Sequence, residues 1–187
     1  MSRLDIPNRV FLDTCVLNFI LEHGGAIFES EAPSNNLSQR TKDDINALYN
    51  IFLVGERASW QLAISPFTYK EIVSTRDDSQ RYYLEKWFSD VWDYWISVLE
   101  EDDDLPSFRE AEQLKIRLLS SGALDALPDI EDRVLICDAL AYNCDCFCTR
   151  DFRTILKHRK ELDPLSIQIL TPTEWWSAIK PYARLWV

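Results

Sequence analysis

Short apolar segments alternate with longer amphipathic ones along the chain, and this alternation constrains the fold more than any other feature. We interpret the apolar segments as buried strands at residues 9–13, 60–64, 145–149 and 166–170. Helical spacing of apolar residues predicts helices at 15–22, 41–55, from 66 onward, 80–99, 107–120, 132–143, 152–160 and 173–179. Strands separated by helices are typical of a parallel sheet with helices on both faces. The sequence therefore predicts an α/β fold of three layers, with a central parallel sheet of about four to five strands flanked by helices.

The size and composition fit a single soluble domain. The chain has 187 residues, of which 47% are hydrophobic and 27% charged, and 4 Gly and 8 Pro leave little room for a flexible linker. The amino terminus lacks the apolar stretch of a secretory signal. No segment approaches the roughly twenty apolar residues that are needed to span a bilayer. We therefore expect a cytoplasmic protein without a membrane partner.

Three of the five cysteines, Cys144, Cys146 and Cys148, recur at every second position. This spacing predicts that their thiols lie on one face of a strand. A zinc site would need paired ligands at looser spacing and usually histidine support, and His23 and His158 are the only histidines. We interpret these cysteines as small buried hydrophobic side chains in a reducing compartment.

Four acidic residues are placed where a site for chemistry would form. Asp13 and Asp151 follow predicted strands, and the functional crevice of an open parallel sheet lies at the carboxyl ends of its strands. Glu71 and Asp132 belong to helices that should pack beside them. Four converging carboxylates would repel one another unless a cation neutralised them. Oxygen ligands alone favour Mg²⁺ or Mn²⁺, which can activate water and stabilise charge on a phosphoryl group.

Three neighbouring residues are secondary candidates. Asp138 follows Asp132 by six positions, so it points to a different helix face and is a weaker candidate for a ligand. Thr14 and Thr149 adjoin Asp13 and Asp151 along the chain, and each could hold a carboxylate or a metal-bound water in place. The alternative for both threonines is a hydrogen bond to nearby backbone.

Three segments that contain these acids resemble motifs of the PIN-domain ribonuclease family. Residues 10–17 (VFLDTCVL) resemble the opening strand and helix, and residues 64–72 (ISPFTYKEI) resemble the segment with the second acid. Residues 132–152 (DRVLICDALAYNCDCFCTRDF) are similar to the segment with the third and fourth acids, including its Thr-Arg-Asp ending. The motifs occur in the family's order and span most of the chain.

The resemblance implies a metal-dependent endoribonuclease that hydrolyses RNA phosphodiester bonds with metal-activated water. It implies that Asp13, Glu71, Asp132 and Asp151 are the catalytic metal ligands, with Mg²⁺ or Mn²⁺ as cofactor. Many family members are toxins of bacterial toxin–antitoxin pairs, so an antitoxin protein and a second copy of the chain are partners to consider beside RNA. Residues 1–187 would form one PIN-like domain with insertions at approximately 24–45 and 78–122.

Two alternatives to a ribonuclease are open at this point. A PIN-like domain can be retained as a catalytically inactive interaction module. A phosphatase with Asp13 as nucleophile is the weaker alternative, because the related dehalogenase-like enzymes place a second acid where this chain has Cys15.

The net charge of −11 argues against a protein that holds nucleic acid by bulk electrostatics. Local positive charge nevertheless follows the last acid, and the candidates for RNA contact are Arg150, Arg153, Lys157, Arg159 and Lys160. The alternative is a solvated basic face. The aromatic residues Trp87, Trp92, Tyr94 and Trp95 recur at helical spacing, which favours core packing over base stacking. The acidic run at residues 100–104 is interpreted as a solvated loop.

Overall fold

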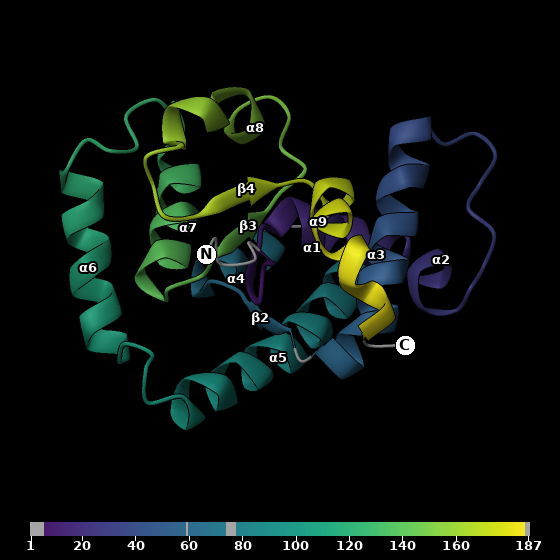
Figure 1. Cartoon of the computed structure of the whole chain (residues 1–187), viewed down its shortest axis with the longest axis horizontal. Helices are drawn as coiled ribbons and strands as arrows, with labels where there is room; N and C mark the ends of the chain where they lie inside the picture. The colour runs from purple at the N-terminus through teal and green to yellow at the C-terminus, as the bar shows by residue number, and fades with distance from the viewer. Residues whose placement is uncertain (1–5, 59, 74–77, 186–187) are drawn as a thin grey trace.

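The computed structural model of the chain describes residues 6–58, 60–73 and 78–185, and within them four strands form one parallel sheet. The strands are β1 (Arg9–Leu12), β2 (Gln61–Ala63), β3 (Cys146–Cys148) and β4 (Gln168–Leu170), in the spatial order β2-β1-β3-β4 (Figure 1). In the register of the two central strands, Phe11 lies opposite Phe147. The predicted α/β class with a central parallel sheet is confirmed.

Helices connect all of these strands. In chain order they are α1 (Thr14–Glu22), α2 (Gly24–Phe28), α3 (Gln39–Ala58), α4 (Pro66–Val73), α5 (Asp78–Glu101), α6 (Phe108–Ser120), α7 (Ile130–Ala141), α8 (Ile155–His158) and α9 (Pro172–Ile179). Two 3₁₀ helices follow α8 and α9, η1 (Arg159–Leu162) and η2 (Lys180–Leu185). No helix within the described ranges is both long and apolar enough to cross a membrane.

Each face of the sheet has its own hydrophobic core, because side chains alternate along a strand. Val10, Leu12, Cys146 and Cys148 pack with buried residues of α1, α2, α3 and α9 on one face. Phe11 and Phe147 stack on the other face with ring centroids 5.4 Å apart, and buried residues of α6 and α7 cover them. The molecule therefore has the three layers that the sequence predicts.

Helix α5 passes beside the edge strand β2 and contributes to both cores (Figure 1). Phe88 packs in the core with α1 and α3, whereas Trp95 is fully buried in the core with α7. Trp87 and Trp92 are partly buried against these cores, and the Tyr94 hydroxyl donates to the backbone oxygen of Trp60 at 2.9 Å. The predicted core packing is confirmed for Trp95 and in part for Trp87 and Trp92, whereas Tyr94 is 41% exposed.

The cysteine prediction is correct for only two of the three thiols. Cys146 and Cys148 share one face of β3 and the same core. Cys144 precedes the strand and packs in the opposite core, so alternation does not extend to it. All five cysteines of the chain are free thiols.

Two local predictions are wrong. No helix was predicted between residues 22 and 41, but Gly24 and Gly25 begin α2, whose Ile27 is buried against α1 and α3. The predicted helix at 152–160 begins only at Ile155 and continues as η1. Its expected first turn is replaced by a turn in which the Asp151 carboxylate accepts hydrogen bonds from the backbone nitrogens of residues 153 and 154.

Candidate functional site

Asp13 lies directly after β1 and is almost completely buried. Its backbone nitrogen donates to the oxygen of Cys148 at 3.1 Å, so the ladder between the two central strands continues to this residue. Its carboxylate, in a residue only 5% exposed, accepts hydrogen bonds from the Thr149 hydroxyl at 2.5 Å and from the Cys15 thiol at 2.9 Å. Thr149, directly after β3, thus holds the carboxylate of Asp13, directly after β1.

Asp151 is connected to Asp13 through the same threonine. The backbone nitrogen of Asp151 donates to the Thr149 hydroxyl oxygen at 2.9 Å. The Asp151 carboxylate accepts from the backbone nitrogens of Arg153 at 2.8 Å and Thr154 at 3.0 Å, and also from the Thr154 hydroxyl. This network is an Asx-type turn that fixes the orientation of Asp151.

Asp132 reaches the site from the first turn of α7. It is half-buried, and Thr154, whose hydroxyl donates to Asp151, also interacts with the Asp132 carboxyl group and lowers its pKa. Burial, together with the negative charges of Asp151, Asp129 and Asp13, raises the pKa of Asp132 to about 6, and a hydrogen bond with Thr154 opposes the rise. The third acid is therefore electrostatically coupled to the first two.

The pKa values of Asp13 and Asp132 are raised, whereas the pKa of Asp151 is lowered. Burial raises the pKa of Asp13, and the charge of Asp151 adds to the rise while the bonds from Cys15 and Thr149 oppose it. For Asp151, partial burial is outweighed by hydrogen bonds from Thr154 and neighbouring backbone nitrogens, which lower its pKa. No ion pair within the described residues involves any of the three. The site therefore concentrates negative charge that a cation would relieve.

Glu71, the second acid of the predicted set, belongs to α4, but its side chain lies outside the described residues. The helix itself is close to the site, because the Thr14 hydroxyl donates to the Thr68 hydroxyl at 3.3 Å. Thr14 thus joins the start of α1 to α4. The role of Glu71 stays a prediction.

Asp138 has different partners from the three site acids. It is 4% exposed, accepts from the Ser65 hydroxyl at 2.5 Å and forms an ion pair with the Lys115 amine at 2.9 Å. Burial raises its pKa, whereas the bonds from Ser65 and Lys115 oppose the rise. Its charge therefore already has a cationic partner, on α6.

The five basic candidates divide into two groups. Arg150 forms a buried ion pair with Asp44 at 2.9 Å and stacks on the Phe19 ring at 3.6 Å. Arg159 pairs with Glu174 at 2.8 Å. The side chains of Arg153, Lys157 and Lys160 are exposed and form no ion pair within the described part of the chain.

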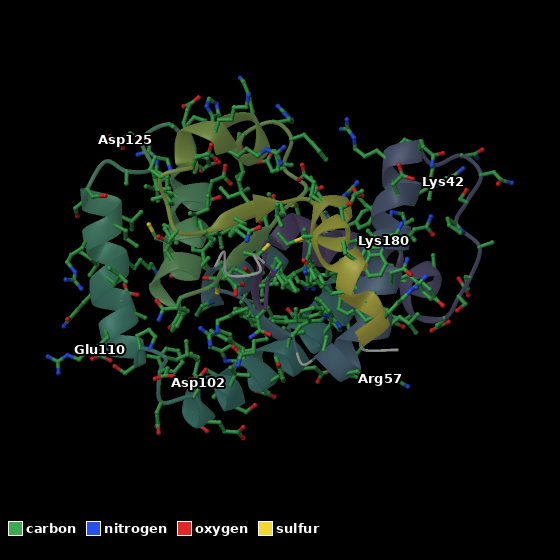
Figure 2. The ribbon with its side chains drawn as sticks, in the orientation of Figure 1. Lys42, Arg57, Asp102, Glu110, Asp125 and Lys180 are labelled. Atoms are coloured by element: carbon green, nitrogen blue, oxygen red, sulfur yellow. The ribbon has the colours of Figure 1, made fainter. Side chains whose placement is uncertain are left out.

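Figure 2 shows nitrogen-tipped side chains over the segment that Figure 1 labels α8, the helix that contains Lys157, and it labels Lys42 beside α3. Positive charge is thus available at the rim of a negatively charged site. This arrangement offsets locally the overall charge of −11.

The donor chemistry of the site suits a hard divalent cation, since carboxylate oxygens are the ligands that Mg²⁺ and Mn²⁺ prefer. Within the described residues, no group of three or more carboxylate, thiol or imidazole side chains forms a ready-made metal site. Thr154 connects two of these acids, because its hydroxyl donates to Asp151 and its side chain also lowers the pKa of Asp132. A cation held by Asp13, Asp132 and Asp151 would therefore require side-chain movements.

Comparison of the chain with models of known protein families, with curated proteins and with solved structures finds no match. The function of the site is therefore inferred from its own geometry and chemistry.

Two residues of this network, Cys15 and Thr154, were not among the predicted site residues. Cys15 donates to Asp13 and accepts from the Arg150 backbone nitrogen at 3.1 Å, so it joins both sides of the site. The Asp-x-x-Thr spacing of residues 151–154 is a signal for a turn closed by side chains, and it could have identified Thr154. The role of Cys15 depends on contacts between distant segments and has no comparable local signal.

Proposed function

We propose that this chain is a metal-dependent endoribonuclease of the PIN type, with Mg²⁺ or Mn²⁺ at Asp13, Asp132 and Asp151. The observation that carries the proposal is the coupling of three carboxylates from separate segments, which raises the pKa of Asp132 to about 6 through burial and through the charges of its neighbours. Neighbouring carboxylates that have no lysine or arginine as an ion-pair partner repel one another, and this repulsion favours the binding of a cation.

The side chains of the chain have distinct roles in this proposal. Asp151, whose pKa is lowered by its hydrogen bonds, provides a carboxylate ligand, and Asp13 is held in position by Thr149 and Cys15. Asp132 is partly protonated only near its pKa of about 6, and at that pH a bound cation would release part of a proton from it. A bound divalent metal supplies Lewis-acid stabilisation of the charge that develops on a phosphodiester and makes water a better nucleophile.

RNA is the substrate class that fits the rim. Arg153, Lys157 and Lys160 are exposed beside Asp151 and are not used in ion pairs of the described residues, so they can contact a phosphate backbone. Arg150 instead contributes by anchoring the turn through Asp44. Within this proposal the enzyme acts in the cytoplasm, and an antitoxin protein or a second copy of the chain is its protein partner.

A catalytically inactive PIN-like interaction module is the second candidate. Such a module would keep the fold and the basic rim but would neither bind a divalent cation at the three acids nor cut RNA.

The test is cleavage of a mixed pool of structured and single-stranded RNA in Mn²⁺, in Mg²⁺ or in EDTA. The wild type is compared with Asp13→Asn and with Asp129→Asn, a matched control that removes an exposed charge from the start of α7 while keeping an N-cap side chain. We expect metal-dependent cutting by the wild type and the control, and none by Asp13→Asn. Equal cutting by Asp13→Asn would rule out the proposed site.

A folded wild type that leaves every RNA intact in both metals would favour the interaction module. The same three proteins also test the toxin role, by expression in a bacterial host without any partner. Growth arrest by the wild type and the control, but not by Asp13→Asn, is the result expected of a nuclease toxin.

A further inference from the structure

Phe152 is an aromatic residue that the surrounding fold leaves accessible beside the candidate site. It directly follows Asp151, so their Cα atoms are about 3.8 Å apart. The Phe152 backbone nitrogen donates to the Arg150 oxygen at 3.0 Å, which fixes the turn, while the side chain is 38% exposed. Full burial of a phenylalanine side chain would stabilise the fold, and Phe152 lacks part of this stabilisation because its ring is exposed.

Arg40, near the start of α3, approaches the same ring from a distant part of the chain. Its guanidinium carbon is 4.3 Å from the centre of the Phe152 ring, and Arg40 is itself exposed. An exposed cation–π pair contributes only about 0.5–1 kcal/mol to folding. The pair thus places a flat hydrophobic surface and a positive charge together at the edge of the acidic site.

We propose that Phe152 and Arg40 form a stacking subsite for one nucleobase of single-stranded RNA, next to the phosphodiester bond at Asp151. This inference rests on the proposed nuclease function and adds a substrate preference to it. Bases stack on aromatic rings and on arginine planes with little regard to sequence, because every base has a flat π face. The subsite therefore selects unpaired RNA rather than a particular base.

Preference for a single strand follows from the geometry of nucleic acids. In a duplex each base is already stacked and its faces are covered, whereas an unpaired base can turn onto a protein side chain. Loss of one base–aromatic contact weakens binding by roughly 5- to 100-fold. The same loss should leave the binding of a perfectly paired duplex unchanged.

The experiment measures binding rather than cutting. A short single-stranded oligoribonucleotide with one 2-aminopurine is titrated with the full chain in EDTA, where metal-dependent cleavage is absent, and stacking is detected as fluorescence quenching. The proteins are wild type, Phe152→Ala, Phe152→Trp, Arg40→Ala and the control Phe108→Ala. Phe108 is 50% exposed at the start of α6, and Figure 2 labels Glu110 at that end of the helix, far from α8 in this view.

We expect quenching with wild type and Phe108→Ala, retained quenching with Phe152→Trp, and loss of quenching with roughly 5- to 100-fold weaker binding for Phe152→Ala. Arg40→Ala should weaken RNA binding and should reduce the dependence of the affinity on salt concentration. Unchanged quenching in Phe152→Ala, or no binding of the oligonucleotide by wild type, would overturn the inference. Cleavage that persists without quenching would refute only the subsite, whereas quenching without any metal-dependent cleavage would refute only the nuclease.

Discussion

Replacement of Asp132 by Asn should stabilise the fold at neutral pH. Burial and neighbouring acids raise the pKa of Asp132 from 3.8 to about 6. A carboxyl group whose pKa is raised by folding stabilises the protein fully below about pH 4, and this contribution is lost as the pH rises through about 6. Above that range the ionised carboxylate opposes folding, and the neutral amide of Asn should relieve the penalty.

The size of this effect follows from the shift. Two pKa units correspond to about 3 kcal/mol, and this figure is reduced to about 1–1.5 kcal/mol because Asp132 is only half-buried and solvent screens its charge. Asp132→Asn should therefore raise the free energy of unfolding by about 1 kcal/mol at pH 7.5 without metal. For a chain of this size the melting temperature would rise by about 2–4 °C.

The assay is urea unfolding followed by the fluorescence of the seven tryptophans, in EDTA, at pH 7.5 and at pH 4. The stabilisation should be present at pH 7.5 and absent at pH 4. The exposed control Asp103→Asn, in the acidic run at residues 100–104, should change the stability by less than about 0.5 kcal/mol at both pH values. A destabilised Asp132→Asn protein at pH 7.5, or an equal gain at both pH values, would refute the electrostatic reasoning.

Three further predictions follow from other contacts of the site. Thr154→Val removes the hydroxyl bond that lowers the pKa of Asp151, so the acidic limb of the cleavage–pH profile should move to higher pH, and Thr154→Ser should restore it. Asp44→Ala breaks the buried ion pair with Arg150 and should cost about 3 kcal/mol in urea unfolding; a loss under about 1 kcal/mol would show that the pair does not anchor the turn. Lys157→Ala should weaken RNA binding for all sequences and reduce the slope of log affinity against log salt by about 1, and an unchanged slope would exclude a phosphate contact.

Much of the fold could be predicted from local patterns. The apolar run at residues 10–12 and the strand before Thr149 are recognisable because strands buried on both faces consist of continuous apolar residues. The helix α2 was missed because Gly24 and Gly25 are typical of helix ends, whereas burial of Ile27 between α1 and α3 stabilises a new turn there. Tertiary packing overrides local propensity at such places.

The candidate site was predictable to the extent that its acids follow strands or begin helices. Asp13 and Asp151 could be placed because parallel strands end at the same edge of the sheet. The ion pair of Arg150 could not be predicted, because its partner Asp44 lies 106 positions away in the sequence. The effect of Thr154 on Asp132 likewise depends on how α7 approaches the turn after β3.

The central claim is that Asp13, Asp132 and Asp151 together bind a divalent cation, and calorimetric titration with Mn²⁺ tests it most directly. Titrations at pH 6 in two buffers of different ionisation enthalpy also count the protons released. We predict binding by wild type and Asp129→Asn, with release of part of a proton from Asp132, and loss of binding in Asp13→Asn and Asp151→Asn. Equal Mn²⁺ affinity in all four proteins, or no binding by the folded wild type, would contradict the account.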